Sequence, residues 1–312
     1  MRRTTKSQGI DEVEERTSHR DKLVAYSSVS FPNGDPLPTL SSDKVLDMCL
    51  DHYGQRLAVS SSDGRICVWD LDCSTGQWVG SAHTESEWQT GTIIHQLRWA
   101  HPNFGQILAS AGSDNILILW EECEEDEEDE EDNETQQGRT DLLLASTTKR
   151  YRWVPKARLN DARAFVTCIG FAPPHLGLKV AAGSADGMVR IYEAIDLMNL
   201  HYWPLHACID VDATTTSTTG SRNSSSSIVM TEQPVGVTCL AWSTRRLQEL
   251  PTLAVGTSNG TIALYRYYDT ARQWLLLLQF PGHTGGGGVI DIAWAPNMGR
   301  NFHWIASIGQ DR

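Results

Sequence analysis

Five stretches of this chain repeat one layout at constant internal spacing, and this repetition restricts the fold more than any other feature. Each stretch begins with a short apolar strand that ends at Leu50, Trp99, Phe171, Trp242 or Trp294. A second strand then runs into a turn at Asp63, Asp114, Asp186, Asn259 or Asp311. In the first four stretches an aromatic residue follows six positions later, at Trp69, Trp120, Tyr192 and Tyr265. Because the internal spacing is kept while the connections vary in length, the repeated object is a folded unit of four short strands.

The hydrophobic pattern of these units predicts an all-β protein. Residues 94–99 alternate in polarity, as a β-strand does, whereas residues 116–120 are apolar at every position. A strand without a polar face must be covered on both sides, so each sheet is expected to lie between two neighbours. Such stacking around an axis is typical of a β-propeller.

The unit boundaries define the expected domain organisation. We expect a polar N-terminal arm over 1–40 and an open propeller over 41–312, with disordered insertions at 121–147 and 211–234. The blades are expected at about 45–79, 94–159, 165–208 and 237–280, and an incomplete fifth blade at 289–312. The sequence stops at Asp311 and Arg312, inside the hairpin of the fifth unit. We therefore expect it to be an incomplete version of a longer protein, in which residues 304–308 present an open sheet edge.

The turn Asp followed by a strand-closing aromatic resembles the WD40 blade. Only Trp69 and Asp70 form a literal Trp-Asp pair. His83 and His283 stand where WD40 proteins place a histidine that bonds the turn Asp, which would staple two loops of one blade together. Both could also be ordinary surface histidines.

Charge is concentrated in one segment of the chain. The formal net charge is −13, but residues 121–134 alone carry 12 acidic side chains, so the remainder is close to neutral. A near-neutral domain without a basic stripe does not favour nucleic-acid binding. The acidic run could attract a basic partner, such as a histone tail or a transport factor, or could be a solvated spacer. Its place in a loop favours the spacer.

No catalytic or cofactor-binding constellation is evident in the sequence. Ser61, Asp63 and His83 are residue types found in nucleophilic triads, but the same types recur in every blade as turn and strand residues. The seven cysteines are odd in number and lack a Cys-x-x-Cys pair, which fits neither a disulfide framework nor a zinc site. We expect no enzyme activity, no cofactor and no metal. The absence of a secretory signal or a transmembrane stretch favours a cytosolic or nuclear location.

Loop residues that the blade fold does not require carry a narrower resemblance. Residues 51–58 (DHYGQRLA), 99–109 (WAHPNFGQILA) and 171–178 (FAPPHLGL) are similar to the propellers of the nuclear pore and of the COPII coat. Residues 185–194 (ADGMVRIYEA), 196–200 (DLMNL) and 295–303 (APNMGRNFH) resemble the Seh-type nucleoporin of the Y-shaped pore scaffold.

This resemblance implies a function as well as a fold. It implies a six-bladed, incompletely closed propeller that accepts a blade from an α-solenoid nucleoporin, in a scaffold that supports protein and mRNA transport at the nuclear envelope. The edge Val45 to Leu50 in the first blade would then flank the partner. A second role in a GATOR-type complex, which reports amino-acid supply at the lysosome, is part of the same resemblance and is not assigned by residues. The rival hypotheses are a COPII-type coat propeller and an adaptor that reads basic peptides through its acidic loop.

Overall fold

Five antiparallel sheets make up the computed structural model, which describes residues 44–80, 92–124, 151–211, 235–244, 250–283, 287–296 and 302–311. Blade one contains β1 (Val45–Leu50), β2 (Arg56–Ser61), β3 (Ile66–Asp72) and β4 (Gln77–Gly80). Blade two contains β5 (Ile94–Trp99), β6 (Ile107–Gly112), β7 (Leu117–Glu124) and β8 (Tyr151–Leu159). Blade three contains β9 (Val166–Phe171), β10 (Lys179–Ser184), β11 (Met188–Glu193) and β12 (Leu205–Asp210). Blade four contains β13 (Val237–Trp242), β14 (Thr252–Thr257), β15 (Thr261–Tyr268) and β16 (Gln273–Pro281), and the described part of blade five contains β17 (Val289–Trp294) and β18 (Ile305–Gly309).

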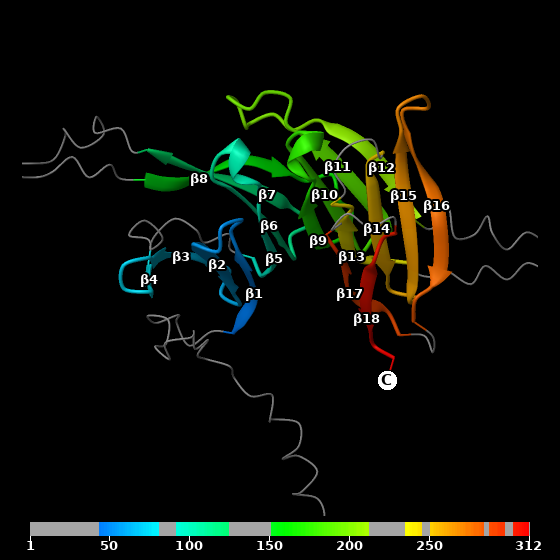
Figure 1. Ribbon diagram of the computed structural model, residues 1–312, viewed down its shortest axis with the longest axis horizontal. Helices are drawn as coiled ribbons and strands as arrows, with labels where there is room; N and C mark the ends of the chain where they lie inside the picture. The colour runs from blue at the N-terminus through cyan, green and yellow to red at the C-terminus, as the bar shows by residue number, and fades with distance from the viewer. Residues whose placement is uncertain are drawn as a thin grey trace, which may run out of the picture.

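The strands of each blade follow one another in chain order, and the first strand of each blade packs against the first strand of the next. β1 lies on β5, β5 on β9, β9 on β13, and β13 on β17. The blades therefore form an arc, with β1 at one end and the pair β17 and β18 at the other (Figure 1). Among the described residues, no strand lies between those two ends. The all-β, open propeller predicted from the repeat spacing is thus confirmed.

Most of the hydrophobic core lies between the sheets, and one smaller cluster, formed by Leu57, Val59 and Trp69, lies within blade one. Ala58 and Val68 of blade one pack with Leu97 and Trp120 of blade two, and similar clusters lie between each later pair of blades. Every residue of β6 and of β14 is buried, because both faces of these strands are covered by neighbouring blades.

Polar contacts also join the inner strands of successive blades. The Asp47 carboxylate accepts a hydrogen bond from the Leu97 amide at 2.8 Å, and the Gln96 side chain accepts one from the amide of Ile169. The Trp99 indole donates to the Cys49 carbonyl at 3.1 Å. Side chains of one blade thus satisfy backbone groups of an adjacent blade, and this fixes the stagger of the arc.

The insertion in blade two starts later than expected from the sequence. We expected the disordered insertion to begin at residue 121, but β7 continues to Glu124 and pairs with β8 up to Tyr151. Two of the additional residues are held by ion pairs, between Glu121 and Lys156 at 3.2 Å and between Glu122 and Arg56 at 2.6 Å. The first acidic side chains of the run therefore belong to the folded blade. The rest of the acidic run, the N-terminal arm, the Ser/Thr-rich insertion at 212–234 and His83 lie outside the described residues.

Candidate interaction surface

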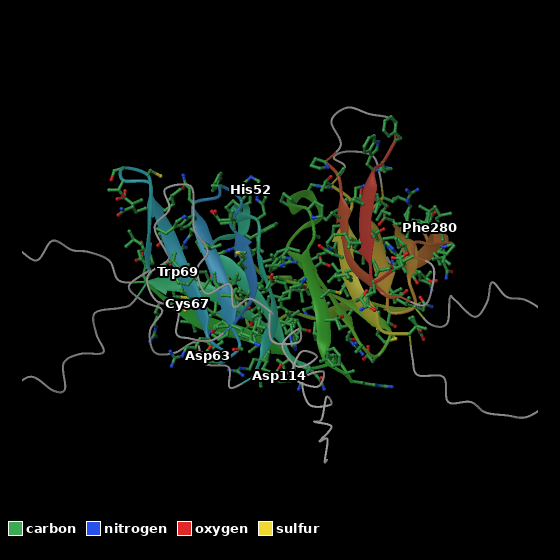
Figure 2. The ribbon with its side chains drawn as sticks, turned by 90° about the horizontal axis from the view of Figure 1, so that it is seen from below. His52, Asp63, Cys67, Trp69, Asp114 and Phe280 are labelled. Atoms are coloured by element: carbon green, nitrogen blue, oxygen red, sulfur yellow. The ribbon has the colours of Figure 1, made fainter. Side chains whose placement is uncertain are left out.

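The turn residues predicted from the repeat close each blade by accepting main-chain hydrogen bonds. Asp63, Asp114, Asp186 and Asn259 each accept the amide two residues ahead, at 3.1, 3.2, 3.1 and 3.0 Å. Figure 2 shows Asp63 and Asp114 at one edge of the arc, away from His52 at the other edge. An Asp or Asn side chain that bonds its own backbone two residues on is the usual device of a tight turn, so the arrangement is structural.

The structure brings the predicted pair His283 and Asp311 together. The Nδ1 atom of His283 lies 2.6 Å from a carboxylate oxygen of Asp311, and its Nε2 atom lies 3.1 Å from the Ser307 hydroxyl. His283 precedes β17 and Asp311 follows β18, so the contact joins two loops of blade five.

In blade three, an arginine and not a histidine binds the turn aspartate. The buried Arg190 donates to Asp186 at 2.8 Å and to the Ser184 hydroxyl at 2.9 Å. Burial acts to raise the pKa of Asp186, but the hydrogen bonds from Arg190 and Ser184 outweigh it and lower the pKa to about 2. This blade therefore holds its turn through an ion pair inside β11 and the adjoining turn.

The four strand-closing aromatics, Trp69, Trp120, Tyr192 and Tyr265, are all buried. The Trp120 indole donates to the Ser110 hydroxyl at 2.9 Å, and the Tyr192 hydroxyl donates to Asp161 at 3.0 Å. These residues anchor the third strand of each blade and are not available to a partner.

Two further findings concern cofactors and membranes. All seven cysteines are free thiols, and the described residues contain no cluster of three His, Cys, Asp or Glu side chains that could hold a metal ion. Within the same residues, no helix has the length and apolar character needed to cross a bilayer.

The first open face of the arc belongs to blade one. The fourth residue of the inner strand is Met48 in β1, Leu97 in β5 and Ile169 in β9. Leu97 and Ile169 are 0% and 2% exposed because the preceding blade covers them, whereas Met48 is 50% exposed. Leu50 is likewise exposed at the position where Trp99 packs on blade one. We call Met48 and Leu50 the blade-one flank; they lie on the predicted partner-binding strand Val45–Leu50.

The second open face belongs to blade five. Ile305 packs toward blade four, so the alternation of β18 directs Trp304 and Ile308 to the opposite side, where Ile308 is 62% exposed. Asp291 is the third residue of β17. The equivalent third residues of β1 and β5, Asp47 and Gln96, accept hydrogen bonds from the backbone of the following blade. We call Asp291, Trp304 and Ile308 the blade-five flank. Both flanks are inter-blade faces of the same design as those buried elsewhere in the arc.

Comparison with known proteins agrees with this architecture. The family model of the WD domain, G-beta repeat, matches residues 34–70. Nucleoporin SEH1-A of Xenopus laevis is 32% identical over 283 residues, which covers 86% of this chain and 64% of that protein. The human nucleoporin SEH1 gives the same identity and coverage, and the Danio rerio protein is 30% identical over 282 residues. The chain is thus similar to nucleoporin SEH1 over most of its length and contains a match to the WD40 repeat.

The match covers only part of the length of these nucleoporins. The chain spans 64% of the length of these nucleoporins. A solved structure, that of Sqt1 from Saccharomyces cerevisiae, matches with a TM-score of 0.51 at 12% identity and covers 79% of this chain and 53% of that one. At this identity the structural match supports the fold alone.

Sequence reasoning missed the residue that joins blades one and two most extensively. Arg56 donates to Asp70 at 2.7 Å and through both terminal nitrogens to Glu122 at 2.6 and 2.8 Å. Its guanidinium carbon also lies 5.6 Å from the ring centres of Trp99 and Trp153. Arg56 is the first residue of a second strand, and this position gives no sign of a partner 66 residues away.

Proposed function

We propose that the chain is a non-enzymatic scaffold subunit of the nuclear pore complex, at the nuclear envelope, and that it supports protein and mRNA transport. Its relation to nucleoporin SEH1 over 86% of its length supports this proposal. The partner that we propose is an α-solenoid nucleoporin of the Y-shaped scaffold, which would contribute β-strands to the open arc.

The exposure of Met48 is the observation that carries the proposed mode of binding. The same strand position is buried between blades at Leu97 and Ile169, so the blade-one flank already has the shape and polarity of an inter-blade face. An added sheet would bury Met48 and Leu50 on one side and Trp304 and Ile308 on the other. Such an occupant needs apolar side chains at alternate positions, so that they all lie on one face, and a β-strand supplies this arrangement.

Introducing one negative charge on the blade-one flank and measuring partner binding tests this proposal. Met48→Asp should weaken capture of the stoichiometric partner by at least about tenfold, because it would bury an unpaired carboxylate at the centre of the contact. The matched control is Met198→Asp, since Met198 is 94% exposed and lies in the connection after β11 of blade three. The measurement is quantitative co-purification of the full chain with its partner. Equal capture by both variants would exclude the blade-one flank as the binding face.

The identity of the captured partner separates the rival functions. A cage protein of the COPII coat in place of pore subunits would indicate a vesicle coat role, and a nutrient-signalling complex at the lysosomal surface would indicate the GATOR-type role. An adaptor for basic peptides requires the acidic run, so deletion of residues 125–134 should then abolish binding. The scaffold proposal predicts that this deletion has little effect, because Glu121 and Glu122 remain in β7.

A further inference from the structure

A cavity of about 380 Å³ opens between blades three and four, away from the two flanks. Four aromatic rings line it, from Trp242 at the end of β13, Tyr267 in β15, Trp274 in β16 and His206 in β12. The ring centres of Trp242 and Trp274 are 5.7 Å apart at 72°, and those of Tyr267 and Trp274 are 5.6 Å apart. Its volume is within the range of roughly 300–1,000 Å³ that is common for ligand pockets.

The equivalent place between blades one and two is filled by a side chain of the chain itself. Trp99 ends β5 as Trp242 ends β13, and Trp153 faces Glu122 in register as Trp274 faces Tyr267. The rings of Trp99 and Trp153 are 5.6 Å apart at 66°, nearly the geometry of the second pair. Between blades one and two, the Arg56 guanidinium lies 5.6 Å from both rings. Arg56 therefore shows that such a pair of tryptophans can bind a guanidinium group.

Between blades three and four, the residue equivalent to Arg56 does not fill this space. Lys179 begins β10 and pairs in register with Glu193, as Arg56 begins β2 and pairs with Asp70. Its ammonium lies 2.9 Å from Glu193, and no contact of Lys179 with the rings corresponds to that of Arg56 among the described residues. An ammonium is compact, whereas a guanidinium is planar and stacks on aromatic rings. The aromatic side chains consequently border a cavity.

The charges around the cavity suit a cation. Glu193 neutralises Lys179, and burial, together with the positive charge of Lys179, lowers the pKa of His206, so the imidazole is neutral near pH 7. Asp269 lines the cavity and is exposed to solvent, which adds a negative charge where a ligand would enter. Aromatic faces attract cations, and a carboxylate at the mouth strengthens that attraction.

We propose that this cavity binds the side chain of an arginine presented by a partner polypeptide, with the guanidinium against Trp242 and Trp274 and directed toward Asp269. This site is separate from the two flanks and does not depend on the proposed pore function. It would add a second, sequence-reading contact to a protein whose main partner is proposed to pack on the two flanks.

The test uses the full chain labelled with 5-fluorotryptophan and followed by fluorine NMR. N-acetyl-argininamide is the probe, and N-acetyl-citrullinamide, which has the same shape without the charge, is its control. We expect saturable shifts of the Trp242 and Trp274 signals, assigned through Trp242→Phe and Trp274→Phe, and no shift of the Trp153 signal, where Arg56 already fills the site. Citrullinamide should bind at least about threefold more weakly. Equal shifts with both compounds, or none that saturate, would overturn the proposal.

Two variants at one position provide a matched control. Lys179→Arg should fill the cavity with a guanidinium of the chain itself, as Arg56 does, and should abolish probe binding. Lys179→Gln cannot stack in this way and should retain binding. If Lys179→Arg binds the probe as well as Lys179→Gln does, the cavity is not a guanidinium site.

Discussion

At the scale of single residues, the second turn of each blade depends on one side chain that accepts hydrogen bonds. Asp186 is the most strongly held of these, since it receives Arg190 at 2.8 Å, the amide of Met188 at 3.1 Å and the amide of Arg163 at 3.0 Å. Its pKa of about 2 is below the value of roughly 3.9 for a free Asp. The ionised form of Asp186 is therefore favoured in the folded state, and this preference contributes to stability.

Asp186→Asn should reveal that contribution through its dependence on pH. A carboxylate whose pKa is lowered on folding stabilises the protein above its unfolded pKa, and this stabilisation is lost as the pH decreases toward the folded pKa. We expect the variant to unfold with a free energy about 2 kcal/mol lower at pH 7. The difference between wild type and variant should shrink between pH 4 and pH 2. Urea unfolding at a series of pH values measures it, and a difference that does not change with pH would contradict the role of this ion pair.

The sequence predicted the turn residues of the blades, but it did not predict that Arg190 binds one of them. The turn positions Asp63, Asp114, Asp186 and Asn259 followed from spacing because the local backbone requires them. The partner of Asp186 did not, because an arginine four residues along the chain looks like any surface arginine until the fold buries it. The pairing of His283 with Asp311 was anticipated as one of two alternatives.

At the scale of elements, the contacts between blades decide which strands are long and which side chains are buried. Arg56 links β2 to β3 and β7, and its guanidinium lies beside two tryptophans of blade two. This contact explains the extension of β7 beyond Trp120, because Glu122 has a fixed cationic partner. A strand end set by a contact across blades is not visible in the local sequence.

Arg56→Lys should weaken this contact although it conserves the charge. A lysine cannot form the two-pronged bond to Glu122 or present a planar cation to both rings, so we expect the unfolding free energy to decrease by about 1–3 kcal/mol. The control is Arg65→Lys, because Arg65 pairs with Asp63 through an exposed side chain. Thermal unfolding of both variants provides the measurement. An equal decrease in unfolding free energy in both variants would show that the contacts of Arg56 between the blades contribute no additional stability.

At the scale of the whole molecule, the number and order of the blades were predictable and the use of their open ends was predictable only in part. Repeat spacing determined the sheets, because each unit buries its faces only by stacking on a neighbour. The sequence suggested the strand Val45–Leu50 as a partner-binding edge, and the exposure of Met48 identifies the side chain through which this strand would bind. The cavity between blades three and four was not anticipated, since it depends on the comparison of Lys179 with Arg56 in three dimensions.

The most direct test is the structure of the full chain bound to the partner with which it co-purifies. Our account predicts that strands of that partner lie between β1 and the pair β17 and β18 and bury Met48 on one flank and Ile308 on the other. A partner bound only to the outer strands, with both side chains as exposed as they are here, would contradict it. So would a ring in which the chain's own residues cover both flanks.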